Sequence, residues 1–365
     1  MIKEPLKISG AGISGLCAAI TASKSNIAVE VRDAAKSIEE KRSRGINAVR
    51  NYNSETDILS EYRDMGFKLE KFHPIYRQVY ATNTVKTIEI ESEDRPIFYT
   101  TSRGIKGSID HLLESQAISQ GIKVKWDSQF EKSDILATGP KYNHCIGYGE
   151  HFVDVTDIST ILVFQNPKYT PNGYICILPY TNNEATVILG TFNPQSSASL
   201  KRNYQHITNN ISLFKEFIKD ATKRNTLVGT GNFGLPESAL NGKTLVVGER
   251  AGFLGAYRGY GIDNAIRSGH IAGKAIVNGS NYDELWQKLL KESLTRGILR
   301  RLAENHLNLG SEKILDLAIK NLPKTTTVTD FRAEIKKIER GLLEQVDISE
   351  LYRLLEQWNK QYPFP

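Results

Sequence analysis

The sequence has few cysteines and no long apolar run. Its 365 residues include three cysteines, Cys17, Cys145 and Cys176, which lie far apart. An odd, scattered set favours reduced, mostly buried thiols over a disulfide framework. No apolar stretch has the length of a bilayer span, and residues 1–5 lead directly into a predicted strand rather than into a signal peptide. We therefore expect a cytoplasmic protein.

Charge of one sign is not in large excess either. The formal net charge is +6, and the basic residues are dispersed along the chain. No basic-aromatic cluster or recognised module predicts a nucleic-acid partner. An anionic substrate or a membrane surface remains an alternative to a simple solvated basic surface. His144, Cys145 and His151 lie close together, but they lack a second ligand pair at zinc-like spacing, so no metal site is predicted.

A glycine pattern near the amino terminus organises the chain. The alternating run Leu6–Ile8 precedes Gly10, Gly12 and Gly15, spaced as G-x-G-x-x-G, and the helix-compatible run Leu16–Ala22 follows. In a strand–turn–helix unit these glycines allow the tight turn, the approach of the backbone to a pyrophosphate, and helix–sheet packing. The N–H groups at the helix start then face the anion. The pattern predicts a dinucleotide site.

An acid at the end of the next predicted strand supports this site. Residues 26–33 alternate as a strand, and Asp33 follows Gly10 at close to the offset of roughly 20 residues expected for an acid that accepts ribose hydroxyls. Glu30 points to the opposite face of the strand and is the poorer choice. Arg44, in the polar segment beyond, is a candidate for the cofactor phosphate or ribose, with a solvated loop arginine as the alternative.

The middle of the chain changes character. Asp57 is a predicted N-cap, and residues 79–90 and 96–101 alternate as antiparallel strands. Ala137–Gly139 ends a short apolar strand with small residues, which let a second backbone segment approach a cofactor. Residues 144–192 carry aromatic residues, turns and strand-like alternation, which indicate an inserted antiparallel sheet that serves as a substrate platform.

Two further glycine-rich segments differ in what they predict. Gly229, Gly231 and Gly234 repeat the first spacing, but Pro236 follows where a helix should begin, so we reject a separate nicotinamide-binding domain. In residues 241–277, by contrast, a strand ends at an acid, a glycine-rich loop follows, and apolar residues then repeat at helical spacing. That segment predicts a second helix start suited to an anion.

These motifs together carry a resemblance. Gly10, Gly12, Gly15 and Asp33, the strand end Ala137–Gly139, and residues 246–276 resemble the FAD-binding framework of the para-hydroxybenzoate hydroxylase-like flavoproteins. Within that superfamily the chain is most similar to the geranylgeranyl reductases. Residues 171–190 are similar to their substrate-domain pattern, a Tyr followed by apolar residues and a Pro before a turn and strand.

The resemblance implies an α/β fold, α+β overall, in three parts. A Rossmann-like FAD-binding domain is expected from residues 1–75, 100–143 and 225–280. An antiparallel substrate sheet is expected from residues 76–99 and 144–224, and a C-terminal helical cap from 281–365. The residues expected to hold FAD are Gly10, Gly12, Ile13, Ser14, Gly15, Asp33, Arg44, Arg103, Thr138, Gly139, Gly248, Glu249, Gly259, Gly261 and Ile262.

The chain also departs from the family pattern. The usual Gly-Asp-Ala-Ala is replaced by residues 248–251, Gly-Glu-Arg-Ala, and the proline usual in the next loop is replaced by Ala256. Residues 45–51 lack the cysteine that geranylgeranyl reductases carry near the flavin, and the tryptophan-rich motif of flavin halogenases is absent. Glu249 keeps the carboxylate expected to contact the ribityl chain, so FAD binding is still predicted.

The resemblance implies an FAD-dependent oxidoreductase, with a best interpretation as a reductase of carbon–carbon double bonds in an isoprenoid or similarly apolar small molecule. Tyr260, Arg258 and Tyr174 are the catalytic candidates, and NAD(P)H is a possible transient electron donor. The alternatives are a flavin monooxygenase that hydroxylates or epoxidises, and a flavin-binding protein without turnover. A basic amphipathic stripe over residues 285–302 allows peripheral membrane contact, although packing against the body of the protein is favoured.

Overall fold

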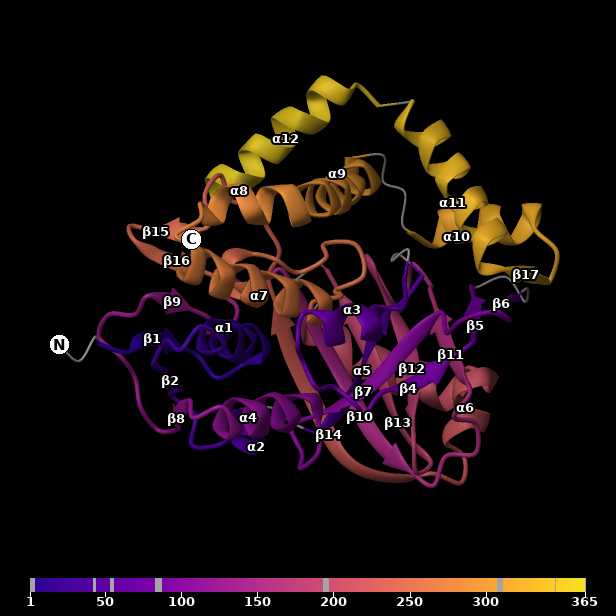
Figure 1. Ribbon diagram of the computed structural model, residues 1–365. Coiled ribbons are helices and arrows are strands. Elements are labelled where there is room, and N and C mark those ends of the chain that lie inside the picture. Colours follow the sequence, from indigo (N-terminus) through magenta and orange to yellow (C-terminus); the bar gives the residue numbers. More distant parts are fainter. Residues whose placement is uncertain are drawn as a thin grey trace.

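The computed structural model describes residues 4–41, 44–52, 56–82, 87–192, 197–306, 311–344 and 346–364. Figure 1 shows three regions: a sheet flanked by helices at the amino-terminal side, a larger sheet beside it, and an arch of C-terminal helices over both. This arrangement is the predicted α/β chain with an inserted sheet and a helical cap.

The first sheet is built from short, buried strands. Its order is β15-β16-β9-β1-β2-β8, and all its pairs are parallel except β15 with β16. The side chains of Ile8 and Val31 are fully buried, as expected for a parallel sheet covered by helices. The strands are β1 (Leu6–Ser9), β2 (Val29–Arg32), β8 (Lys123–Lys125), β9 (Ile135–Leu136), β15 (Leu240–Asn241) and β16 (Thr244–Val246).

Helix α1 (Ile13–Ser23) lies between α4 (Ile109–Ser119) and α7 (Ile262–Asn278). Ala and Ile dominate α1, and ten of its residues are buried, so its sequence suits a helix enclosed on several sides. Two glycines of α7 allow an unusually close approach. A Cβ at Gly269 would lie 2.2 Å from the carbonyl oxygen of Ser14, and one at Gly273 would lie 2.7 Å from that of Ala18.

The larger sheet has the order β14-β10-β13-β12-β11-β5-β6-β17, and a small third sheet has the order β3-β7-β4. Pairing in the large sheet is antiparallel except at β11 with β5 and at β6 with β17. The strands are β3 (Gly45–Arg50), β4 (His73–Ile75), β5 (Arg77–Ala81), β6 (Thr87–Glu91), β7 (Phe98–Arg103), β10 (Cys145–Val153), β11 (Thr160–Phe164), β12 (Gly173–Tyr180), β13 (Glu184–Thr191), β14 (Thr222–Gly231) and β17 (Thr325–Thr327).

Three of the remaining helices have a side-chain cap at their first turn. Asp57 accepts hydrogen bonds from the N–H groups of Leu59 and Ser60, which confirms the predicted N-cap. Asn281 and Asp347 cap two C-terminal helices in the same way. The helices not yet described are α2 (Ile38–Lys41), α3 (Ile58–Asp64), α5 (Ser197–Asn210), α6 (Ser212–Ile218), α8 (Tyr282–Trp286), the π-turn η3 (Gln287–Lys291), α9 (Glu292–His306), α10 (Ser311–Asn321), α11 (Val328–Leu343) and α12 (Ile348–Gln361).

Two strands lie differently from the predicted segments. β14 continues through Gly231 in the large sheet, past the boundary predicted at residue 225, because it pairs with the whole of β10. β17, from the region 281–365 predicted as helical, pairs with β6. The second glycine pattern lies partly on β14 and is followed by β15 and β16 rather than by a helix, so it does not form a strand–turn–helix unit.

Apart from Leu289, which is 42% exposed, the apolar stripe of the C-terminal helices packs inward. Leu290, Leu294 and Ile298 are at most 3% exposed. This packing is the arrangement favoured above for residues 285–302. Among the described residues, no helix combines the length and apolar character needed to cross a bilayer.

The C-terminal segment returns to the start of the large sheet. The ring of His144 lies 4.3 Å from that of Tyr362 and 4.8 Å from that of Trp358, between ring centroids. The carbonyl oxygen of Pro363 accepts a hydrogen bond from the hydroxyl of Tyr142. His144 therefore belongs to an aromatic cluster that holds the end of the chain.

Two buried histidines make the stability of the fold depend on pH. Burial lowers the pKa of His144, and that of His270 on α7, from the usual 6.5 to about 4. The unfolded chain therefore binds these protons at a higher pH than the folded chain does. The corresponding stability is fully present above pH 6.5 and is lost as the pH falls toward 4.

As the pH falls from 7.5 to 5, each histidine should lower the free energy of unfolding by about 2 kcal/mol, because the unfolded chain takes up its proton first. Urea unfolding at the two pH values measures this loss. His270→Gln should lose about 2 kcal/mol less than the wild type over the interval, and His206→Gln, at a ring that stacks on Tyr169, serves as the control. Equal losses in the wild type and His270→Gln would contradict the assignment.

Candidate functional site

Two positions of the first glycine turn leave no room for a side chain. Gly10 has a φ of 107°, and a Cβ there would lie 2.3 Å from the carbonyl oxygen of Ala137. A Cβ at Gly15 would lie 2.0 Å from the carbonyl oxygen of Gly10. Any larger residue would therefore push β1, α1 and the end of β9 apart. The sequence pattern predicted a tight turn and close helix–sheet packing at these glycines.

Gly12 has a different environment. A Cβ there would meet only the flexible amine of Lys41, with Nζ at 3.7 Å. Gly12 is the N-cap of α1, no side chain caps the helix, and its first turn carries no acid. The first N–H groups of α1 therefore face open space beside a cation, and these are the groups that bind a pyrophosphate. The residues present fit the dinucleotide part of FAD.

Asp33 lies beside this turn. Its carboxylate is buried, and it accepts hydrogen bonds from the N–H groups of Ala11 at 2.7 Å and Ala35 at 3.1 Å. Lys41 of α2 forms an ion pair with the same carboxylate. A ribose diol at this position would share Asp33 with Lys41, a residue that the sequence reasoning missed. The signal that could have identified Lys41 is its position in the polar segment after Asp33.

The glycine-rich segment that begins at Gly248 lies against the first glycine turn. Gly248 has a φ of 61°, and a Cβ there would lie 2.6 Å from the hydroxyl of Ser14. It begins the 3₁₀ turn η2 (Gly248–Ala251), directly after β16. Glu249 follows, and its Oε1 lies 3.5 Å from a Cβ built at Gly231 and 3.7 Å from one built at Gly261. The acid thus lies between the end of β14 and the start of α7.

The other predicted cofactor residues are distributed around these turns. Thr138 is exposed and Gly139 has a φ of 85°, both just after β9. Ile13 is buried at the start of α1, and Ile262 is buried at the start of α7. Gly259 has a φ of 70° in the loop that leads to α7.

Both predicted arginines are paired with carboxylates. Arg103, at the end of β7, donates to Asp110 through Nε at 2.6 Å and Nη2 at 2.8 Å. Burial acts to lower the pKa of Arg103, but Asp110 and, further off, Glu249 raise it. Arg44 pairs with Glu184 of β13 at 2.5 Å, toward the large sheet. Contact of Arg44 with a cofactor stays a prediction.

Tyr174, Arg258 and Tyr260 come together from different elements. The hydroxyl of Tyr174, on β12, donates to the carbonyl oxygen of Arg258 at 2.5 Å. The guanidinium of Arg258 lies 5.2 Å from the centre of the Tyr174 ring. Tyr260 stacks on Phe98 of β7, with 6.0 Å between centroids. The structure therefore places the three catalytic candidates in one neighbourhood, beside the start of α7.

Burial keeps these phenols protonated. Desolvation raises the pKa of Tyr260 well above its usual value, and it raises the pKa of Tyr174 as well. Within the described part of the chain, no protein group forms a hydrogen bond with the hydroxyl of Tyr260. Its proton is thus available to a bound molecule, whereas that of Tyr174 already serves a carbonyl oxygen.

A small cavity separates β3 from the start of α7. It has a volume of about 20 Å³ and is lined by Ala48, Val49, Arg50, Tyr260, Ile262, Asp263 and Asn264. Arg50, which the sequence reasoning did not select, lies 4.8 Å from the centre of the Tyr260 ring. This volume is enough for water and too small for an aromatic ring system. A flavin ring at this position would displace Arg50 or Tyr260.

Comparison with known proteins first defines the class of fold. No family model matches the chain. Among solved structures, a flavin-dependent brominase has a TM-score of 0.62 at 13% identity, with 97% of this chain and 99% of that chain covered. A halogenase solved with FAD has a TM-score of 0.58 at 12% identity, with 98% and 95% covered. The chain has the fold of these flavoproteins.

The particular likeness is to geranylgeranyl reductases. A geranylgeranyl bacteriochlorophyll reductase-like protein from Thermoplasma acidophilum has a TM-score of 0.74 at 17% identity, over 95% of this chain and 98% of that chain. A digeranylgeranylglycerophospholipid reductase from Methanocella arvoryzae is 26% identical over 204 residues, 50% of this chain and 49% of that protein. A second, from Methanococcoides burtonii, is 26% identical over 227 residues, 57% of this chain and 53% of that protein.

The chain thus spans about half the length of the curated relatives that it matches. The resemblance stated from the motifs alone is confirmed by sequence and by fold. The sequence matches carry the likeness to the reductases, and the structural matches carry the fold.

Replacement of Gly12 tests the dinucleotide turn. Gly12→Val should weaken FAD binding at least tenfold, about 1.4 kcal/mol or more, because the side chain would fill the space in front of the α1 N–H groups. The fold should persist, since a Cβ there meets only Lys41 Nζ at 3.7 Å. FAD titration followed by flavin fluorescence measures the change.

Gly229→Val is the matched control. Gly229 belongs to the second glycine pattern, and nothing lies within 4 Å of a Cβ built there. Its variant should bind FAD as the wild type does. Loss of FAD in Gly229→Val together with retention in Gly12→Val would show that the anion site has been assigned to the wrong turn.

Proposed function

We propose that this protein is an FAD-dependent oxidoreductase that reduces carbon–carbon double bonds in an isoprenoid or similarly apolar substrate. The observation that carries the proposal is the placement of Gly12 and Gly248 at neighbouring turns, with the carboxylates of Asp33 and Glu249 beside these turns. The likeness to two reductases of geranylgeranyl lipids supports the substrate class.

The protein groups have distinct proposed duties toward FAD. The first N–H groups of α1 and the amine of Lys41 bind the pyrophosphate, and Asp33 accepts the ribose hydroxyls. Glu249 accepts hydroxyls of the ribityl chain. When bound, FAD supplies the capacity to take up an electron pair from a donor such as NAD(P)H and to transfer it as hydride.

The residues around the small cavity orient the substrate and hold a proton. Tyr260 is the favoured proton donor, because its hydroxyl is protonated and no protein group in the described residues accepts from it. Tyr174 and the backbone of Arg258 fix one another through their hydrogen bond. The apolar residues beside them, among them Cys176 and Ile75, exclude water from the reacting alkene.

A peripheral membrane contact would suit a lipid-chain substrate. Ile348 and Tyr352, one turn apart on α12, are 63% and 51% exposed. Figure 1 shows α12 as one side of the helical arch. We propose this surface for weak contact with a bilayer. Sedimentation with phospholipid vesicles tests it, and a protein left wholly in the supernatant would refute it.

The first test of the function combines cofactor and reaction. The purified protein should carry FAD or gain thermal stability from it, and the reduced, FAD-loaded protein should reduce a geranylgeranyl lipid in the absence of oxygen. Substrate-stimulated oxygen consumption would favour a monooxygenase instead. FAD that dithionite reduces, but that no alkene or oxygen-dependent substrate reoxidises, would favour a flavin-binding protein without turnover.

The second test concerns the proton donor. Tyr260→Phe should lower the turnover number about 100-fold or more, the lower range for loss of a general acid, while leaving FAD content unchanged. Tyr174→Phe should lower it less than Tyr260→Phe, because the Tyr174 hydroxyl is already bonded to a backbone carbonyl. Single-turnover oxidation of the reduced protein by substrate measures both. An unchanged rate in Tyr260→Phe would remove the residue from the mechanism.

A further inference from the structure

A buried histidine of the large sheet shares an acid with an arginine. The ring of His151, on β10, is wholly buried, and its Nε2 lies 3.4 Å from Oε2 of Glu184, the first residue of β13. The other carboxylate oxygen of Glu184 pairs with Arg44, the residue before β3. One carboxylate therefore faces two basic groups. We call these residues the Arg44–Glu184–His151 group.

The hydrogen bonds around His151 define its tautomer. Its partner across the β10–β13 ladder is Thr186, whose Oγ1 accepts a hydrogen bond from the N–H of Ile46 at 2.8 Å. The hydroxyl proton of Thr186 is then directed to Nδ1 of His151, at 3.2 Å. Because Nδ1 accepts this bond, the ring proton lies on Nε2 and faces Glu184.

Glu184 and Arg44 act on His151 in opposite directions. Burial lowers the pKa of His151 below its usual 6.5, the positive charge of Arg44 lowers it further, and Glu184 acts to raise it. The ring is therefore neutral at pH 7, and the carboxylate serves Arg44. Removal of Arg44 from this position would end a repulsion and free the carboxylate, so the ring would then bind a proton more readily.

The other neighbours of β10 leave the charge of His151 to these two groups. Glu150, the preceding residue, points to the opposite face of the strand and pairs with Lys223 of β14. Helix α5 packs against β10, and its Tyr204 lies on the face that carries Glu150. The residue opposite His151 in the β10–β14 ladder is the neutral Asn225.

The next strand on the side of β3 carries a charge that is already paired. Arg103 of β7 lies opposite Gly45 in the third sheet, and its guanidinium is held by Asp110 of α4. The side chain of Asn225 donates to the carbonyl oxygen of Arg44 at 3.1 Å, which ties the start of β3 to β14. Arg44 is thus fixed by its backbone to one strand and by its side chain to another.

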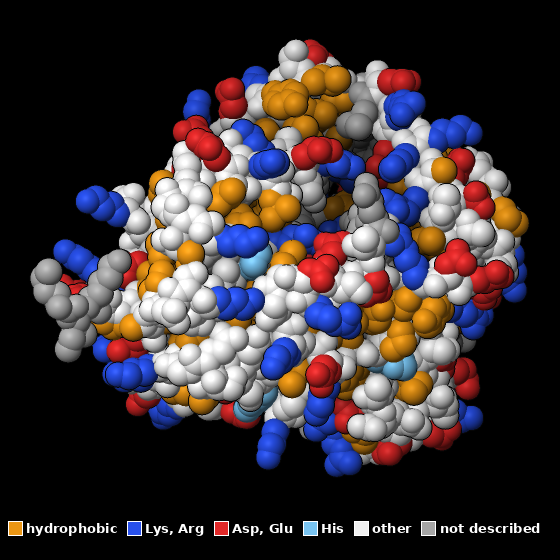
Figure 2. All heavy atoms as spheres, viewed as in Figure 1, with side chains coloured by type: hydrophobic (Ala, Val, Ile, Leu, Met, Phe, Trp, Pro, Cys, Tyr) orange, Lys and Arg blue, Asp and Glu red, His pale blue; other side chains and the backbone are white. Residues whose placement is uncertain are grey.

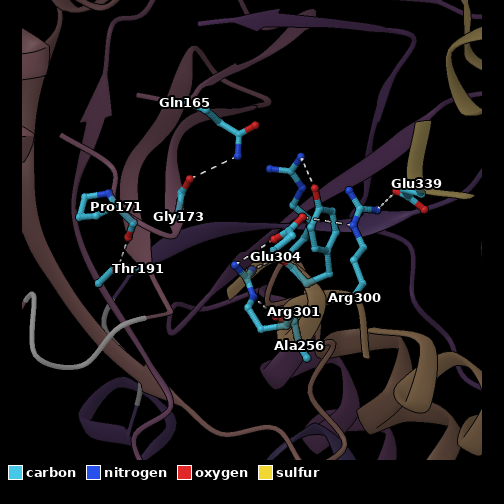
Figure 3. A network of polar contacts seen from close by, with 11 residues as sticks. Gln165, Pro171, Gly173, Thr191, Ala256, Arg300, Arg301, Glu304 and Glu339 are labelled. Carbon is cyan, nitrogen blue, oxygen red and sulfur yellow. Dashed lines mark hydrogen bonds and ion pairs between the residues drawn. The ribbon is translucent and has the colours of Figure 1, made fainter. Parts of the chain in front are cut away.

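Elsewhere in the fold, charges are arranged differently. Figure 3 shows Arg300 directed toward Glu339, with Glu304 between Arg300 and Arg301, so these arginines share acids with one another. Over the face shown in Figure 2, charges of both signs are interspersed, where solvent and salt screen them. A buried carboxylate shared between an arginine and a titratable ring differs from both arrangements.

Glu184 does not satisfy Arg44 completely. The Nε of Arg44 is buried without a hydrogen-bond partner among the described residues, while 35% of its side chain is exposed. Arg44 follows Lys41 by three residues, a separation that covalent geometry limits to about 11 Å between Cα atoms. Lys41 pairs with Asp33 beside Gly12, so the guanidinium of Arg44 lies within reach of an anion bound at the start of α1.

We propose that Glu184 and His151 position Arg44 for FAD, and that FAD binding and protonation of His151 are coupled through Glu184. Without FAD, Glu184 holds Arg44 and His151 is neutral. When FAD is bound, Arg44 turns from Glu184 to the pyrophosphate, and His151 takes up a proton from water and pairs with Glu184. Both are positioning residues, because they act on FAD only through Arg44. The coupling rests on the proposed function, since it takes FAD to be the ligand.

Titration of the protein with FAD at several pH values tests the coupling. Isothermal titration in two buffers of different ionisation enthalpy should show uptake of up to about one proton per FAD. His151 has the higher pKa in the complex, so the complex binds more protons and FAD binding tightens as the pH falls. Between about pH 7.5 and pH 5.5 the affinity should rise about three- to tenfold per pH unit.

Two histidine variants isolate the group that titrates. His151→Gln should abolish the proton uptake and the pH dependence, while any proton exchange of FAD itself remains in this variant. His270→Gln is the matched control, at a buried histidine of α7 whose pKa is also lowered by burial, and it should retain the uptake. Equal uptake by the wild type and by folded His151→Gln, judged by circular dichroism, would overturn the coupling.

A change at the acid tests the positioning role. Glu184→Gln should bind FAD at pH 8 about threefold or more tightly than the wild type, because Arg44 is no longer held by an ion pair. The affinity of this variant should also be independent of pH. Wild-type affinity together with wild-type pH dependence in Glu184→Gln would refute a role of Glu184 in positioning Arg44.

The ionisation of His151 can also be followed without FAD. NMR of the full-length protein with isotopically labelled histidine gives the pKa of His151, whose signal is identified by its loss in His151→Gln. Arg44→Gln should raise this pKa and Glu184→Gln should lower it. An unchanged pKa in Arg44→Gln would refute the shared carboxylate.

The coupling and the proposed function can fail separately. FAD binding without proton uptake would refute the coupling and leave the flavoprotein proposal intact. Absence of FAD binding at every pH would refute the proposed function and with it the coupling to FAD. The shifts of the His151 pKa in Arg44→Gln and Glu184→Gln would still establish the shared carboxylate in that case.

Discussion

The contact between α1 and α7 is the constraint on which the candidate site depends. Glycine at positions 269 and 273 lets the two helices approach until any Cβ would overlap the backbone of α1. That approach brings Gly269, in the middle of α7, against Ser14 at the start of α1, and the turn at Gly248 also lies against Ser14. Two segments that are distant in sequence therefore meet at the first residues of α1.

The charged residues fall into two classes by their surroundings. Asp33, Arg103 and Arg44 are each held by a specific partner, Lys41, Asp110 and Glu184 respectively. Such pairs lower the desolvation cost of burial and fix the direction of each side chain. Arg50 and Arg258 lie over tyrosine rings instead, and Arg332 lies over the Tyr52 ring and donates to the Tyr52 carbonyl oxygen.

The C-terminal third of the chain closes the site rather than extending it. Arg300 and Arg301 on α9, with Glu304 and Glu339, support the loop that carries Tyr257 and Arg258. Phe331 of α11 packs on Tyr80, and Phe364 lies against Gly234 and Gly252. The neighbourhood of Tyr174, Arg258 and Tyr260 is therefore assembled from strands and loops of the first two regions, and helices of the last region pack against it.

The sequence by itself determined the first turn, the acid after β2, the start of α7 and the rejection of the Gly229–Gly234 pattern, because each depends on local spacing, turn geometry or the place of a proline. Only the tertiary structure decided that Arg44 faces Glu184 and that Lys41 meets Asp33. These relations join residues from separate elements, and the pairing of a charge depends on distances through space that sequence separation does not encode.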